Sequence, residues 1–103
     1  MNKRQALAAA RLHVSIYRWG GNWSVSRPWD VRRWGGACTV IKHPTYARAR
    51  ASAAAAVAKV ALAMLGRYGD EARYAIWDQS TDPYADHSAR ALLDAGLRAE
   101  RGQ

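Results

Sequence analysis

Apolar side chains alternate with other side chains over residues 12 to 19. A period of two is typical of a β-strand with one buried face. Gly20 and Gly21 follow directly and allow a tight turn between antiparallel strands. A two-residue turn there pairs Ile16 with Val25, apolar against apolar, whereas a three-residue loop would mix the two faces. The sequence therefore predicts a β-hairpin centred on the two glycines.

Shorter sequence signals predict the elements that come before and after the hairpin. Residues 2 to 11 predict a short first helix that the side chain of Asn2 can cap. Pro28 ends the second strand because it cannot donate a ladder hydrogen bond, and residues 29 to 36 are expected to form an exposed connection. A third strand at residues 37 to 42 then completes an antiparallel meander.

A long helix is predicted after the meander. Residues 46 to 65 contain ten alanines and no helix breaker before Gly66, and Thr45 is a suitable N-cap. Alanine on the buried side of a helix allows a close approach to a sheet. Helical spacing also predicts a polar side that includes Lys59. The expected buried stripe comprises Tyr46, Ala53, Val57, Val60, Ala61 and Met64.

The remaining third of the chain predicts one more strand and one more helix. Residues 72 to 77 have the composition of a fourth strand, and we expect Trp77 in the core together with Trp23. Asp82, followed by a proline, is expected to cap a last helix that reaches about residue 100. Its polar face offers two ion pairs at i,i+4, Asp86 with Arg90 and Asp94 with Arg98.

These elements predict one α+β domain over residues 1 to 103. The expected architecture is an antiparallel β-meander of three to four strands, with the long Ala-rich helix packed on one face and the C-terminal helix beside it. A chain of this length has room for a single core. With no Phe, five Trp and five Tyr, that core depends on Trp, Tyr and scattered aliphatic residues.

Charge divides the chain into two parts. Residues 1 to 67, the basic helix, hairpin, strand and helix, carry 12 Lys or Arg and a single acid, Asp30. Residues 68 to 103, the predicted strand and helix extension, carry four Arg and seven Asp or Glu, and the whole chain has a net charge of +8. A fold needs no such asymmetry, whereas a nucleic acid or another strongly acidic partner attracts a basic surface.

Tryptophan and arginine are interleaved between residues 18 and 34. Aromatic rings beside guanidinium groups can stack on unpaired bases or anchor a protein interface. Trp29 and Trp34 lie outside the strand pattern and are therefore the better candidates for a surface role. We expect the arginines at 32, 33, 48 and 50 to be exposed and to contribute to one positive face. The candidate binding residues are Arg18, Arg27, Trp29, Arg32, Arg33, Trp34, Lys42, Arg48 and Arg50.

The order helix, three strands, helix over residues 2 to 66, with the stretch KHPTYARARASAAAAVAKVALAML, resembles the double-stranded RNA-binding domain. The resemblance implies a basic cluster that grips phosphates at the start of the Ala-rich helix. Arg48 and Arg50 match that cluster by position, with Lys42 nearby. The family's adjacent lysines are absent, and residues 67 to 103 extend beyond the resemblance.

Side chains that could carry catalysis or hold a metal are scattered. The three histidines and Cys38 show no spacing typical of a catalytic triad or a metal site. A lone cysteine excludes an internal disulfide, and we expect Cys38 to be a small buried apolar residue. The acids around Asp82 are better explained by capping and ion pairs than by metal binding. We therefore expect no enzyme activity, catalytic residue, metal, cofactor or small-molecule substrate.

Two functional hypotheses of different classes follow. Lys59 interrupts the longest apolar run and Arg11 the first one, so we expect no membrane span or signal peptide and a cytoplasmic protein. The first hypothesis is a binding module of phage or mobile-element type that engages nucleic acid or a nucleic-acid-bearing complex. The alternative is an inhibitor of a host defence complex that acts by steric blockade, similar to anti-CRISPR proteins in size and lack of a catalytic motif. The sequence leaves the oligomeric state open.

Overall fold

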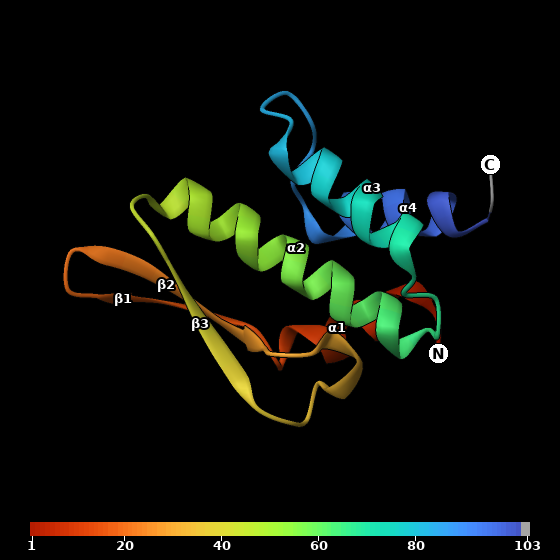
Figure 1. The fold of residues 1–103 in the computed structure, drawn as a ribbon, viewed down its shortest axis with the longest axis horizontal. Helices are drawn as coiled ribbons and strands as arrows, with labels where there is room; N and C mark the ends of the chain where they lie inside the picture. Colours follow the sequence, from red (N-terminus) through yellow and green to blue (C-terminus); the bar gives the residue numbers. More distant parts are fainter. Residues whose placement is uncertain (102–103) are drawn as a thin grey trace.

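The hairpin forms around Gly20 and Gly21 in the computed structural model, which describes residues 1 to 101 (Figure 1). Strands β1 (Ser15–Trp19) and β2 (Asn22–Pro28) pair antiparallel with the predicted two-residue turn, and Gly20 takes a φ of 62°. Strand β3 (Cys38–His43) pairs with β2, so the sheet order is β1-β2-β3. The predicted hairpin register, which sets Ile16 opposite Val25, is therefore confirmed.

The first strand begins later than its alternating pattern predicted. Leu12 is 85% exposed because it is the C-cap of helix α1 (Lys3–Arg11) and not a strand residue. The side chains of Asn2 and Gln5 form a reciprocal capping box at the start of α1. The buried side of this helix packs on the central helix through Ala6, Leu7 and Ala10.

Helix α2 (Tyr46–Met64) is the centre of the molecule. It contacts the sheet, helix α1, helix α3 (Asp70–Thr81) and helix α4 (Ala89–Glu100) (Figure 1). Thr45 Oγ1 accepts a hydrogen bond from the Arg48 N–H at 3.2 Å, and Gly66, with a φ of 68°, ends the helix as its sequence predicted. Tyr46, predicted in the buried stripe, is 49% exposed, so its place in the stripe is wrong. Because neighbours lie on several sides of α2, burial extends beyond the rest of the predicted stripe. The additional buried residues are Ala49, Ala55, Ala56, Ala58 and Leu62.

The predicted fourth strand at residues 72 to 77 is wrong. This segment lies inside helix α3 (Asp70–Thr81), because Ala72 and Ile76 at i,i+4 both pack into the core between helices. The Ala72 N–H also donates to the Glu100 carboxylate at 3.2 Å, which satisfies a free donor in the first turn of α3. A short run of mixed apolar residues fits either periodicity, and here the packing against helices decides.

Helix α4 (Ala89–Glu100) starts at Ser88 and not at Asp82 as predicted. Asp82 is the C-cap of α3, and its carboxylate accepts the Tyr84 N–H at 2.9 Å, so it stabilises a loop between the helices. The predicted ion pairs of α4 also change. Asp86 accepts the Ser88 N–H at 2.9 Å, whereas Asp94 lies 3.8 Å from Arg90 and 2.9 Å from Lys3.

Aliphatic side chains fill the space between the helices. The largest fully buried residues there are Leu62, Ile76, Leu92 and Leu93. A Cβ on Gly96 would lie 2.5 Å from Leu62 Cδ1, so α4 approaches α2 at a distance that only glycine permits. Within residues 1 to 101, no helix has the length and apolar character needed to cross a membrane.

Tryptophan contributes less to the core than predicted. Trp77 is 59% exposed because it lies on the outer side of α3, so its predicted place in the core is wrong. Trp23 is half-buried on the inner face of the sheet, with its ring centroid 4.9 Å from that of Tyr46. Cys38, also predicted to be buried, is exposed in β3 opposite Pro28.

Candidate functional site

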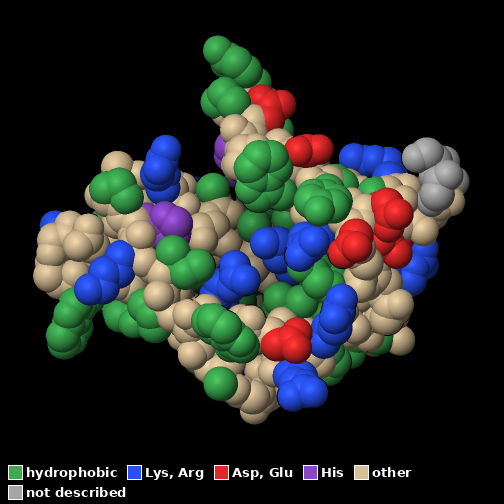
Figure 2. Space-filling view, in the orientation of Figure 1, with side chains coloured by type: hydrophobic (Ala, Val, Ile, Leu, Met, Phe, Trp, Pro, Cys, Tyr) green, Lys and Arg blue, Asp and Glu red, His purple; other side chains and the backbone are tan. Residues whose placement is uncertain are grey.

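Tyr68 lies near the guanidinium charges of Arg27, Arg32 and Arg73, and Lys59 lies near Arg27 and Arg73. Arg27 comes from the middle strand, Arg32 from the short 3-10 helix η1 (Val31–Arg33), Lys59 from α2 and Arg73 from α3. Figure 2 shows Lys and Arg side chains gathered over α2, between the sheet and α3. We call the surface formed by Arg27, Arg32, Lys59, Tyr68 and Arg73 the basic hollow.

The fold fixes these side chains in place. Lys59 projects from the middle of α2 and is partly buried by its neighbours. Val31 is buried against α2, which holds η1 and the exposed Arg32 beside the hollow. Arg32 Cζ lies 5.7 Å from the centroid of the Tyr68 ring, a cation–π arrangement that connects the loop to the end of α2. The hollow is therefore built from β2, η1, α2, α3 and the connection between α2 and α3 that carries Tyr68.

The cations in the hollow act on one another. Burial lowers the pKa of Lys59, and the nearby guanidinium charges of Arg27 and Arg73 lower it further. Burial raises the pKa of Tyr68, while the charges of Arg73, Arg27 and Arg32 act in the opposite direction. The positive field is thus concentrated in one place, where an anion would stabilise every one of these charges.

Acidic side chains compensate this charge only in part. Asp30 Oδ1 accepts the backbone N–H of Arg32 at 3.0 Å and caps η1. Arg73 lies 3.5 Å from Asp70, but both side chains are exposed, so the pair is weak. Among the residues that the structure describes, the buried Nε of Arg27 has no hydrogen-bond partner. A buried donor of this kind costs about 1 to 3 kcal/mol until a ligand satisfies it.

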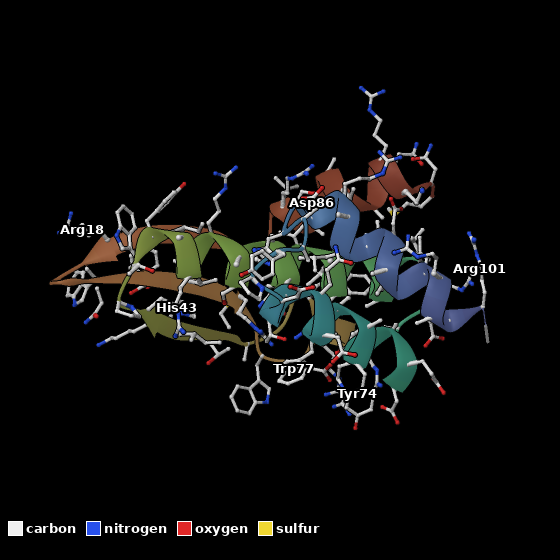
Figure 3. All side chains as sticks on the ribbon, turned by 90° about the horizontal axis from the view of Figure 1, so that it is seen from above. Arg18, His43, Tyr74, Trp77, Asp86 and Arg101 are labelled. Carbon is white, nitrogen blue, oxygen red and sulfur yellow. The ribbon has the colours of Figure 1, made fainter. Side chains whose placement is uncertain are left out.

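Exposed aromatic rings border the basic hollow. Trp29 lies beside its η1 end and is 73% exposed. Tyr74 and Trp77 border its α3 end, are each 59% exposed, and project from the same side of the molecule in Figure 3. Arg73 Cζ lies 5.2 Å from the centroid of the Tyr74 ring. Aromatic and cationic groups are therefore neighbours along the whole surface.

The structure brings four of the predicted binding residues to this surface. Arg27, Trp29, Arg32 and Arg33 line it or lie beside it. Trp34, predicted to have a surface role, is instead half-buried and packs against the main core. The 29 to 36 connection is thus an exposed loop with a buried anchor.

The other predicted binding residues lie elsewhere. Arg18 is at the hairpin tip, with its Cζ 5.7 Å from the Trp23 ring centroid, and Lys42 is exposed on β3. Arg48 projects from the same side of α2 as Lys59. At a rise of about 1.5 Å per residue, the two positions are about 16 Å apart along the helix axis. Arg50 lines a different groove. The arginines at 32, 33, 48 and 50 are all exposed, but α2 directs the last two to different sides.

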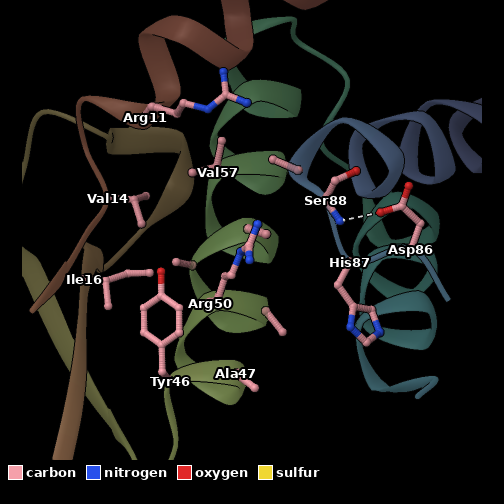
Figure 4. Close-up of a pocket in the computed structure, with 14 residues that line it drawn as sticks. Arg11, Val14, Ile16, Tyr46, Ala47, Arg50, Val57, Asp86, His87 and Ser88 are labelled. Carbon is pink, nitrogen blue, oxygen red and sulfur yellow. Dashed lines mark hydrogen bonds between the residues drawn. The ribbon is translucent and has the colours of Figure 1, made fainter. Parts of the chain in front are cut away.

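The groove at Arg50 lies on the other side of α2, between β1 and the α3–α4 loop (Figure 4). Val14, Ile16 and several alanines make its floor apolar, and Arg11 contributes a second cation. The Ser88 N–H and hydroxyl hold the pKa of the Asp86 carboxyl below its usual range at this border. This groove has fewer cations than the basic hollow and more apolar lining.

Sequence reasoning missed Lys59, Tyr68, Arg73 and Tyr74 as site residues. The last two were assigned to a strand, in which they would point to opposite faces. A helical reading of residues 70 to 81 places Arg73, Tyr74 and the exposed Trp77 at i, i+1 and i+4. The period of the pattern was therefore the signal that could have revealed this side of the site.

Within residues 1 to 101, no cluster of three or more His, Cys, Asp or Glu side chains could hold a metal ion. His87 Nε2 lies 2.6 Å from the Asp82 carbonyl oxygen, which explains the histidine as part of a loop.

No protein-family model matches this sequence, and neither the curated proteins nor the solved structures contain a significant match.

Proposed function

We propose that this protein binds nucleic acid through the basic hollow. The observation that carries the proposal is the convergence of Arg27, Lys59 and Arg73 from β2, α2 and α3, where burial first, and then the two guanidinium charges, lower the pKa of Lys59. Clustered cations of this kind are costly in the free protein and favourable once phosphates lie between them.

A polymeric anion fits this surface better than a small one. Arg33 continues the positive charge beyond η1. The chain as a whole carries a net charge of +8, which attracts a polyanion over a distance and strengthens non-specific contacts. Exposed rings next to the cations are a further feature of nucleic-acid-binding surfaces.

The test compares two double variants that remove the same charge. Arg32→Ala with Arg73→Ala removes two cations of the hollow, whereas Arg4→Ala with Arg98→Ala removes two exposed cations on α1 and α4. Fluorescence anisotropy with labelled DNA and RNA at fixed salt measures affinity. We expect the first pair to weaken binding by about 1 to 3 kcal/mol and the second by far less. Equal effects of the two pairs would contradict the proposed site.

A second candidate function is binding to a protein, as expected of an inhibitor of a larger complex. The α3–α4 loop favours it, because Tyr84 is 95% exposed there between Asp82 and Asp86. Exposed tyrosine is a common interface anchor. A pull-down with and without nuclease separates the two functions. A partner that survives nuclease treatment and is lost on Tyr84→Ala would support the protein interaction.

A further inference from the structure

Helix α3 presents two large rings to solvent beside the basic hollow. Tyr74 and Trp77 are three residues apart and therefore neighbours on the helix surface, and each is 59% exposed. Figure 3 shows both on the same side of the molecule. Ala72 and Ile76 bury the opposite side of the helix in the core. The rings thus have no part in holding α3 in place and are available to a ligand.

The cations of the hollow lie directly beside these rings. Lys59 and Arg73 line the same depression as Tyr74 and Trp77, and Asp78 adds one carboxylate to its lining. Lys59 is partly buried. A phosphate therefore reaches it through the depression that Arg73, Tyr74 and Trp77 also line. A base attached to that phosphate would then lie at the level of the rings.

The η1 end of the hollow repeats the combination. Arg32 packs on the Tyr68 ring, and Trp29 is 73% exposed next to them. Rings and cations therefore occur together at both ends, with Arg73 lining both depressions. Such a track matches a flexible chain in which phosphates and flat bases alternate.

On the basis of the proposed function, we propose that the ligand of the basic hollow is single-stranded nucleic acid, with unpaired bases stacked on Trp77 and Tyr74. In a duplex the faces of the bases are already stacked on each other and only their edges reach the grooves. Exposed rings gain nothing from a duplex unless they enter between its base pairs. On a single strand each ring can stack on a base of any type, which gives affinity without sequence specificity.

The experiment uses the whole chain with three labelled probes: oligothymidine, oligouridine and a mixed-sequence duplex. Trp77→Ala is the test variant, Trp77→Phe keeps a ring, and Trp19→Ala removes another exposed ring, at the hairpin tip. We expect single strands of about 8 nucleotides to bind more tightly than the duplex, and Trp77→Ala to weaken that binding about tenfold. Trp77→Phe and Trp19→Ala should stay within about twofold, because both retain the ring on α3. Thermal melting checks that the variants fold.

Two results would overturn the single-strand inference while leaving nucleic-acid binding intact. One is a duplex that binds as tightly as the single strands, and the other is an equal effect of Trp77→Ala and Trp19→Ala on every probe. Failure of all three probes to bind at low salt would overturn the proposed function itself. Displacement of the single strand by polyglutamate, with the same dependence on Trp77, would identify an acidic protein segment as the ligand and also overturn the inference.

Discussion

Lys59 stands inside an alanine-rich helix with its ammonium group partly withdrawn from water. Burial first, and then the charges of Arg27 and Arg73, lower its pKa, so the protonated form is less stable in the folded protein than in the unfolded chain. A methionine has a similar shape and no charge. The side chain of Lys59 therefore has opposite consequences for folding and for binding an anion.

We predict that Lys59→Met stabilises the free protein by about 0.5 to 1 kcal/mol, the range of single optimised substitutions, and weakens nucleic-acid binding. Chemical denaturation and anisotropy measure the two quantities. A loss of stability would show that the ammonium group forms favourable contacts in the folded state, and unchanged affinity would place the phosphates elsewhere.

The stability difference between Lys59→Met and the parent should also depend on pH. Because the folded pKa of Lys59 is lowered, the unfolded chain binds more protons between that value and its ordinary value of 10.5. The penalty from Lys59 is thus fully present below the folded pKa and decreases as pH rises towards 10.5. Denaturation of both proteins across alkaline pH measures it. A difference that grows with pH would contradict the assignment.

The elements differ in how far the sequence predicts them. The hairpin register follows from alternation around Gly20 and Gly21, and α2 follows from alanine content between Thr45 and Gly66. These signals are local, so they survive without knowledge of the tertiary structure. The sequence does not predict helix α3, because its helical structure depends on burial of Ala72 and Ile76 against helices that are distant in the sequence. The α3 half of the candidate site was lost with it.

The η1 connection illustrates the same limit at smaller scale. Trp29 lies between Pro28 and Asp30, Trp34 lies between Arg33 and Gly35, and the sequence predicts both as surface residues because neither belongs to a strand pattern. Only the structure separates them, since Val31 docks on α2 and brings Trp34 against the core while Trp29 stays exposed. Contacts across the fold therefore decide which ring is available to a ligand.

This difference predicts two distinct responses to truncation. Trp34→Ala should lower the free energy of unfolding by about 1 to 3 kcal/mol because it removes packing against the core. Trp29→Ala should change it by no more than about 0.5 kcal/mol, as expected for an exposed residue. Thermal or urea denaturation of the two variants checks the assignment. Equal losses would mean that the whole connection is structural.

At the scale of the molecule, the acidic third of the chain connects elements of the fold and also neutralises part of the basic charge. Asp94 pairs with Lys3 and Arg90, and Glu100 accepts the backbone N–H of Ala72. The red patches in Figure 2 lie mostly towards the α3 and α4 side of that view. The charge asymmetry of the sequence thus becomes a spatial one, with the basic hollow between the two parts.

Mapping the contact surface by NMR tests the central claim most directly. Amide chemical shifts of the ¹⁵N-labelled protein are followed as an unlabelled single-stranded oligonucleotide is added at low salt. We predict that the largest changes fall on residues 27 to 33, on Lys59 and on residues 68 to 77, which surround the basic hollow. Changes confined to the hairpin tip, the start of α2 and the Arg50 groove would contradict it.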